Sequence, residues 1–302
     1  MMSAAARQVS GVLAAALCLA GCSAAAPTTY RPATKPLRVM SLNICTDQLV
    51  LALLPPERIT SVTYLAREAG SSAMVDEAKR VPENFGLAEE VFRQQPDLVI
   101  ASPFSTTALR NMLKRLRYPM IEVGAANNFD DIRAQVRQVA AAVGEVAKGE
   151  ALIMAMDAKL AALARAPHPT YRVAAWDRLG FGAGKGTLQG AVFEAAGAVN
   201  VADAPPTSGY GQPDAEVLLE AAPPLLVEGS PVARTPSLGD NVEAHRIVRR
   251  FWTSAGRLLT IPQSYYACGT PRTADAVAML REQMRRAAAD AGTPLAYAGR
   301  RQ

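Results

Sequence analysis

The chain has 302 residues, of which 50% are hydrophobic and 20% are charged, and this composition excludes a disordered or fibrous protein. The length allows one large domain or two smaller ones. The formal net charge is +5 without a long basic run, so the charge does not indicate a nucleic-acid binder.

The N-terminal segment has the pattern of a secretion signal. An uncharged apolar stretch runs from Val12 to Ala20, which is shorter than the roughly 20 residues that span a bilayer. It ends in the sequence LAGC, which is similar to the lipobox of bacterial lipoproteins, where the cysteine carries the lipid. A plain signal peptide cleaved at a nearby alanine is the alternative. We expect a signal peptide over residues 1–21, lipidation of Cys22, and a flexible tether over residues 22–36.

Export changes the interpretation of the two cysteines that follow the tether, Cys45 and Cys268. Thiols tend to pair in an oxidising compartment, and two cysteines allow one intramolecular bridge. The sequence does not give the distance between their Cα atoms, so a disulfide and two free thiols both stay open. A thiolate ligand for a bound metal is a third, weaker alternative.

Strands and helices alternate in the N-terminal half. Apolar or β-branched runs predict strands at 37–42, 59–63, 98–101 and 119–123, a loop at 43–47, and helices at 48–54, 87–95 and 106–117. The run at 98–101 is almost wholly apolar, which is typical of a strand buried on both faces. This alternation predicts a lobe over residues 37–128 in which helices cover both faces of a parallel sheet.

A helical connector follows over residues 129–166. Apolar residues recur there at spacings of three or four, which predicts helix. Gly144 interrupts the pattern, and glycine weakens a helix by about 1 kcal/mol, so we expect a break near it. As a helix, the segment from Glu145 to Arg165 would be roughly 30 Å long, which is enough to bridge two lobes.

The strand–helix alternation restarts after the connector. Strands are predicted at 171–176, 225–228 and 258–261, a glycine-rich loop at 180–190, and helices through 193–196 and 273–289. These elements form a C-terminal lobe over residues 167–302. The fold class is therefore α/β, with two Rossmann-like lobes that contain parallel sheets and are joined by a single long bridging helix.

One pattern occurs once in each half. Glu89 and Glu216 each stand seven residues before a proline. In each half, a predicted helix lies between the glutamate and its proline, and a buried strand follows the proline. Any helix–proline–strand unit would share this pattern, but one copy in each half favours two related lobes.

The lipobox, the two glutamate–proline–strand units and the bridging helix together resemble the class III periplasmic binding proteins. These proteins serve ABC importers of iron–siderophores, haem and cobalamin, and the resemblance covers roughly residues 37–290. It implies two lobes that face each other across a shallow cleft, a bulky metal chelate as ligand, and little closure because a continuous helix resists hinging. It also implies that one surface glutamate of each lobe docks on arginines of the permease. By position these are Glu89 and Glu216, with Glu90 and Glu220 as alternatives.

Open α/β sheets bind ligands in loops at the carboxyl ends of their strands. Combined with the resemblance, this rule predicts that the cleft is lined by Asn43, Thr46, Tyr64, Phe104, Trp176, Arg178, Phe181, Lys185 and Tyr210. Aromatic rings offer stiff, flat area to a chelate or macrocycle, while arginine and lysine meet anionic groups. A place in the core is an equal alternative for Trp176, because it ends an apolar strand.

Motifs of common enzymes are not found. The sequence GAGKGT at 182–187 lacks the first glycine of a Walker A motif and the Ser or Thr after its lysine, and there is no Gly-x-Ser-x-Gly or His-Glu-x-x-His sequence. The only two histidines, His168 and His245, argue against a histidine-rich metal site.

We therefore expect a monomeric periplasmic lipoprotein that is not an enzyme and holds no cofactor or resident metal. It would bind a metal chelate, an ABC permease dimer and, through its lipid anchor alone, a membrane. A lipoprotein of the same fold that binds a protein or carbohydrate without a transporter is the alternative. The sequence leaves open whether the chelate is a ferric siderophore, haem or cobalamin.

Overall fold

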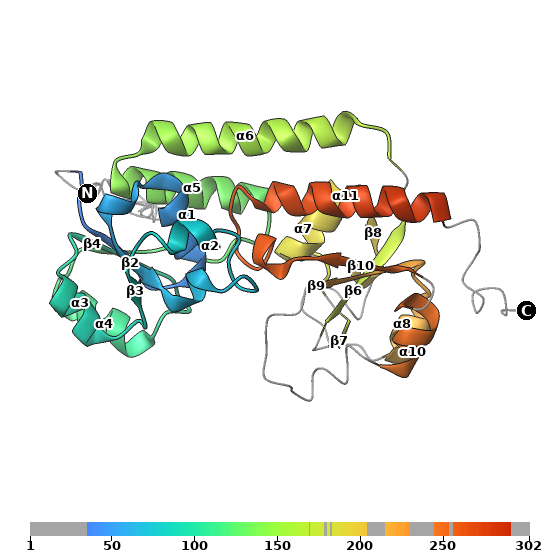
Figure 1. The fold of residues 1–302 in the computed structure, drawn as a ribbon, viewed down its shortest axis with the longest axis horizontal. Helices are drawn as coiled ribbons and strands as arrows, with labels where there is room; N and C mark the ends of the chain where they lie inside the picture. The colour runs from blue at the N-terminus through green and yellow to red at the C-terminus, as the bar shows by residue number, and fades with distance from the viewer. Residues whose placement is uncertain are drawn as a thin grey trace, which may run out of the picture.

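The computed structural model describes residues 35–168, 170–177, 180–181, 183–203, 215–229, 245–253 and 256–290. Within these ranges the chain forms two α/β lobes (Figure 1). The predictions for Cys22, Arg178 and Tyr210 lie outside the described residues, as does the expected signal peptide.

The N-terminal lobe is built on a five-stranded parallel sheet with the order β3-β2-β1-β4-β5. Its strands are β1 (Val39–Ser41), β2 (Ile59–Thr63), β3 (Glu83–Asn84), β4 (Leu98–Ala101) and β5 (Met120–Glu122). All four residues of β4 are buried, as the apolar run predicts. The sequence did not indicate β3, because a two-residue strand is too short to show any alternation.

The helices of this lobe are α1 (Ile44–Leu53), α2 (Val75–Ala78), α3 (Ala88–Gln94) and α4 (Thr107–Arg115), with short 3-10 turns at Pro56–Arg58 and Tyr64–Arg67. The prediction of a loop at 43–47 is wrong, since α1 begins at Ile44. The physical reason is a helix cap: the side-chain oxygen of Asn43 accepts a hydrogen bond from the backbone N–H of Cys45 at 2.9 Å.

The connector consists of α5 (Phe129–Val143) and α6 (Val146–Arg165). The predicted break is confirmed at Gly144, which ends α5 with a φ of +73°, a conformation that favours glycine. In Figure 1, α6 runs along one side of the molecule past both lobes. Its 20 residues correspond to about 30 Å of helix, the length expected of a bridge.

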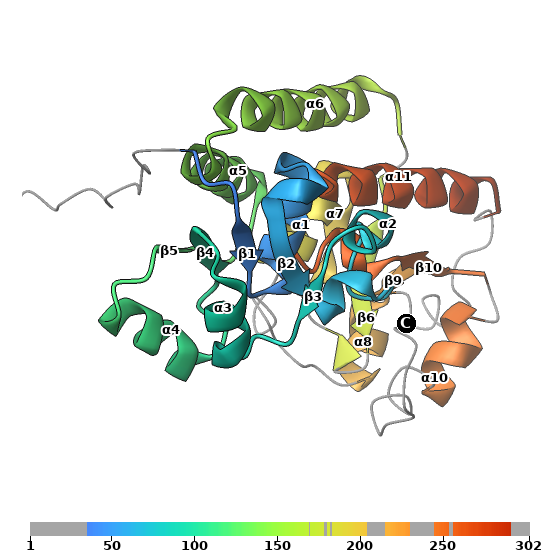
Figure 2. The same ribbon diagram turned by 60° about the vertical axis from the view of Figure 1, so that its left-hand side comes forward.

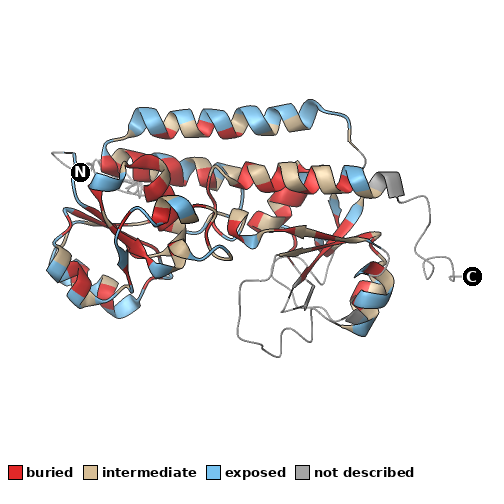
Figure 3. Cartoon of the chain, viewed as in Figure 1, coloured by how far each residue is buried: buried red, intermediate tan, exposed pale blue. Residues whose placement is uncertain are grey.

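Side chains along one face of α6 pack first on one lobe and then on the other. Ile153 and Met156 are each 2% exposed and belong to the core of the N-terminal lobe. Leu160 packs against the cores of both lobes, and Leu163 against that of the C-terminal lobe. Figure 3 shows the opposite face of α6 largely exposed. The bridging helix is therefore anchored in both cores.

The C-terminal lobe contains a second sheet with the order β10-β9-β6-β7, in which β8 also pairs with β6. Its strands are β6 (Arg172–Asp177), β7 (Gly180–Phe181), β8 (Val199–Asn200), β9 (Leu225–Gly229) and β10 (Leu258–Ile261). All described pairings are parallel except that of β7 with β6. The two-residue strands β7 and β8 were not predicted, for the same reason as β3.

The helices of this lobe are α7 (Leu188–Ala195), α8 (Ala215–Ala221), α10 (Arg246–Val248) and α11 (Thr273–Asp290), with a π-helical turn at Arg249–Thr253. Helix α11 packs against α7, β10 and α6. The buried guanidinium of Arg281 on α11 donates to the backbone oxygens of Leu163 and Ala166 and so holds the C-terminal end of the bridge. Within the described ranges, no helix combines the length and the apolar character needed to cross a membrane.

Candidate functional site

The segments that follow the carboxyl ends of the two sheets meet. Cys45, just after β1, and Cys268, after β10, form a disulfide with their Cα atoms 4.9 Å apart. Near this disulfide, Arg272 donates to the backbone oxygen of Ala73 at 3.0 Å and pairs with Glu77 at 3.5 Å. The carboxyl ends of parallel strands share one edge of a sheet. The carboxyl edges of the two sheets therefore face each other.

Four exposed apolar side chains lie along the facing edge of the N-terminal sheet. Tyr64 follows β2, Phe85 and Leu87 follow β3, and Phe104 follows β4, with exposed fractions of 41%, 60%, 53% and 76%. We call these four residues the apolar wall. The rings of Tyr64 and Phe85 stack, with centroids 5.2 Å apart and planes inclined by 23°. Exposed apolar side chains gathered at one edge indicate an interaction surface.

A buried carboxylate holds the backbone beside Tyr64. Asp47 on α1 accepts hydrogen bonds through Oδ2 from the backbone N–H of Thr63, at 3.1 Å, and from the Thr63 hydroxyl. Burial raises the pKa of Asp47 to about 7, although the hydrogen bonds from Thr63 act in the opposite direction. Among the described residues, the other oxygen, Oδ1, has no hydrogen-bond partner. The residue before Tyr64 is thus fixed by a carboxyl group that exchanges its proton near neutral pH.

A second buried carboxylate holds the loop between β3 and α3. Oε2 of Glu90 accepts from the backbone N–H groups of Phe85, at 2.8 Å, and of Leu87, at 3.0 Å. Between these two residues, Gly86 has a φ of +70° and donates its N–H to the side chain of Asn84 at 3.1 Å. Each backbone N–H of residues 85–87 therefore has a side-chain acceptor, which orders the loop.

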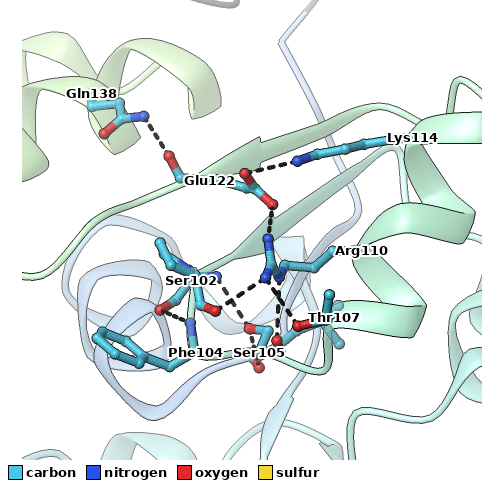
Figure 4. Close-up of polar contacts among 10 residues, drawn as sticks. Ser102, Phe104, Ser105, Thr107, Arg110, Lys114, Glu122 and Gln138 are labelled. Atoms are coloured by element: carbon cyan, nitrogen blue, oxygen red, sulfur yellow. Dashed lines mark hydrogen bonds and ion pairs between the residues drawn. The ribbon is translucent and has the colours of Figure 1, made fainter.

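Phe104 lies in a loop that is ordered by hydroxyl groups and by an arginine (Figure 4). Its backbone N–H donates to Oγ of Ser102, and the N–H of Ser102 donates to Oγ of Ser105, both at 3.1 Å. Arg110 donates to the backbone oxygen of Ser105 at 3.2 Å and pairs with Glu122 at 2.6 Å. Figure 4 shows the ring directed away from this network, so the loop presents it outward.

Two side chains predicted to contact the ligand are buried in the structure. Thr46 is 1% exposed, and its hydroxyl is occupied by Oγ of Ser41, at 2.7 Å, and by the backbone oxygen of Asn43, at 2.9 Å. Trp176 is 2% exposed and packs in a core cluster with Leu218 and Trp252. Thr46 is held inside its lobe because helix α1 begins before it. Trp176 is held inside its lobe because the segments that carry Leu218 and Trp252 cover the end of β6.

The other predicted residues divide into three groups. Tyr64 and Phe104 lie at the expected edge, in the apolar wall. Asn43 is half-buried and caps α1, while Lys185 is exposed in the turn before α7. Phe181 pairs with Trp176 across β6 and β7, and its side chain lies outside the described parts of the structure.

Two residues of the apolar wall, Phe85 and Leu87, were missed from the sequence. Both follow β3, which the sequence did not reveal. The signal available was the sequence Asn84-Phe85-Gly86-Leu87, in which a glycine between two large apolar residues is typical of a turn that exposes them.

The two glutamates predicted to dock on a permease are exposed, Glu89 in the first turn of α3 and Glu216 in that of α8. Helices α3 and α8 lie on the same side of the molecule, away from α6, in both views (Figures 1 and 2). The alternative partner Glu90 is only 7% exposed and is engaged by the loop before α3, whereas Glu220 is exposed.

Across the described residues, no group of three or more His, Cys, Asp or Glu side chains is placed to hold a metal ion. The family model described as periplasmic binding protein matches residues 39–256. The chain belongs to the periplasmic binding protein family. Its two parallel-sheet lobes and long bridging helix are those of the class III members, which confirms the fold class predicted from the sequence. Members of this family bind substrates for transport, and membership implies a location outside the cytoplasmic membrane.

Individual relatives differ in what they bind. The cobalamin-binding protein of Halobacterium salinarum is 26% identical over 258 residues, which cover 82% of this chain and 69% of that protein. The apo form of the periplasmic haem-binding protein RhuT from Roseiflexus sp. RS-1 has a TM-score of 0.66 and 22% identity, covering 83% of this chain and 98% of that one. The vitamin B12 binding protein BtuF of Vibrio cholerae has a TM-score of 0.62 and 16% identity, with coverage of 84% and 98%. At these identities the two structural similarities show the fold alone.

Proposed function

We propose that the protein captures a bulky metal chelate between the facing edges of its two sheets and delivers it to the permease of an ABC importer. The observation that carries this proposal is the apolar wall, which presents stacked rings at the edge of one lobe that faces the other. The relatives support the class of ligand, since they bind cobalamin or haem, both of which are large metal macrocycles.

The shape of the wall suits such a ligand. Stiff aromatic side chains lose little conformational entropy when they contact a flat surface, and they bury a large area. The backbone beside each ring is already fixed by hydrogen bonds to Asp47, Glu90 or Ser102. A preorganised surface avoids the entropic penalty of ordering loops when the ligand binds.

The link between the lobes suits a ligand that is gripped with little closure. The bridging helix is anchored in both cores, and the Cys45–Cys268 disulfide joins the lobes at a second place. Two separate connections restrict hinge motion more than a single flexible loop does. The ligand would therefore enter a site whose width is largely set before binding.

Docking and anchoring complete the proposal. Glu89 and Glu216 meet arginines on the two halves of a permease dimer, one from each lobe, and the charge pairs set the orientation of the complex. The exposure of both residues and the shared side of α3 and α8 support this role. A lipid on Cys22 holds the protein at the membrane, with residues 23–36 as a tether.

The ligand is tested by titrating the purified protein with cyanocobalamin, haemin and a ferric hydroxamate siderophore while its intrinsic tryptophan fluorescence is followed. We expect saturable quenching by at least one of them at a stoichiometry of one per chain, confirmed by calorimetry. Saturable binding of none of the three would contradict the proposal.

A further inference from the structure

Helix α3 begins with two adjacent glutamates that have opposite environments. Glu89 is exposed, whereas the side chain of Glu90 points inward and is 7% exposed. Of these two residues, the docking role proposed above uses only Glu89. A buried carboxylate in the next position requires its own explanation, because burial of a charged group is unfavourable unless hydrogen bonds compensate for the lost water.

The hydrogen bonds of Glu90 reach beyond the helix. Its bond to the backbone N–H of Leu87, at 3.0 Å, is the ordinary capping bond of a glutamate at the third helical position. Its bond to the backbone N–H of Phe85, at 2.8 Å, engages a residue that precedes the helix cap by two positions. This second bond contributes nothing to capping, and both donors belong to the apolar wall.

Through Phe85 the same carboxylate acts on a third side chain. The ring of Phe85 stacks on that of Tyr64 at 5.2 Å between centroids. Phe85 is 60% exposed and Leu87 is 53% exposed, so little packing against the protein holds either side chain in place. Their orientation depends chiefly on the backbone, and one oxygen atom of Glu90 accepts from the backbone N–H groups of both residues.

We propose that Glu90 is a positioning residue that fixes Phe85 and Leu87 in the apolar wall and ties the wall to the helix that presents Glu89. The inference rests on the proposed function for the meaning of the wall, but the positioning itself is a property of the unliganded protein. Glu89 and Glu90 are consecutive residues of one helix turn, so the carboxylate that orders the wall belongs to the same turn as the exposed glutamate.

The test uses amide hydrogen exchange in the unliganded protein, followed by NMR. We expect the amides of Phe85 and Leu87 to exchange at least a hundredfold more slowly than unprotected amides, although both lie in an exposed loop. Glu90→Ala should raise both rates at least tenfold. Glu90→Gln should restore slow exchange, because its amide oxygen can accept the same two bonds without a charge. Arg93→Ala, at an exposed position of the same helix, is the control and should change neither rate.

The second readout is affinity for cyanocobalamin or haemin, whichever the wild-type protein binds. Glu90→Ala should weaken binding about tenfold, while Glu90→Gln and Arg93→Ala should stay within twofold of the wild type. Unprotected exchange at Phe85 and Leu87 in the wild type, or an effect of Glu90→Ala that Glu90→Gln does not rescue, would overturn the positioning role. If no chelate binds the wild type, the proposed function fails, while the exchange data still decide the role of Glu90.

Discussion

The buried carboxyl group of Asp47 should make stability depend on pH in a way that one substitution removes. Its pKa in the folded protein is about 7, against an ordinary value of 3.8, because burial disfavours the charged form. Between these two values the folded protein holds a proton that the unfolded chain has released. The free energy of unfolding therefore falls as the pH rises through this window, and the loss is complete above about pH 8.

The size of the effect follows from the shift. A pKa shift of about three units lowers the free energy of unfolding by roughly 4 kcal/mol, relative to low pH, once the group is fully ionised in the folded protein. At pH 5 the loss is roughly 2 kcal/mol. Asp47→Asn keeps an oxygen that can accept from Thr63 and has no charge at any pH. The difference in the free energy of unfolding, variant minus wild type, should therefore rise by about 2–3 kcal/mol from pH 5 to pH 8.

The assay is urea unfolding of both proteins at pH 5, 6, 7 and 8, with linear extrapolation to zero denaturant. Asp76→Asn is a matched control, because the side chain of Asp76 is 86% exposed. The control should follow the wild type at every pH. A constant stability difference between Asp47→Asn and the wild type across this range would refute the argument that burial governs Asp47.

Two further predictions concern the link between the lobes and the docking surface. Replacing Cys45 and Cys268 by serine removes a cross-link between residues separated by 223 positions, which should lower the free energy of unfolding by up to about 5 kcal/mol in the chain-entropy treatment. Urea unfolding of the double variant checks this, and an unchanged midpoint would contradict a contribution from the disulfide. The charge reversals Glu89→Arg and Glu216→Arg together should abolish uptake of the chelate by cells and leave its affinity for the purified protein intact. An equal loss of affinity would show that these residues are not docking contacts.

The sequence revealed the elements whose signals are long or strongly apolar. The bounds of β2, β4 and β10 agree with the predicted strands, and the connector breaks at Gly144 as expected. These features depend on local composition, which a single sequence contains in full. The short strands β3, β7 and β8 do not depend on local composition in this way. Each has two residues, which gain their extended conformation from the neighbouring strand and not from their own preference.

The candidate site was only partly predictable for a related reason. Exposure of a strand-end residue depends on what covers it, so the sequence leaves open whether Trp176 lies in the core, where the structure places it, or at the edge, where Tyr64 lies. The wall residues Phe85 and Leu87 follow the strand that was missed. Whether Glu89 or Glu90 is exposed depends on the rotation of a seven-residue helix, which a single sequence does not determine.

Binding of the chelate by the apolar wall can be measured through the affinity of a wall variant. Tyr64→Ala combined with Phe85→Ala removes the stacked pair, and Leu116→Ala, which removes an exposed leucine at the end of α4, is the matched control. For the chelate that the wild type binds, calorimetry should show a dissociation constant at least tenfold higher in the double variant, equivalent to about 1.4 kcal/mol, and no change in the control. Wild-type affinity in a folded double variant would show that the apolar wall does not bind the chelate.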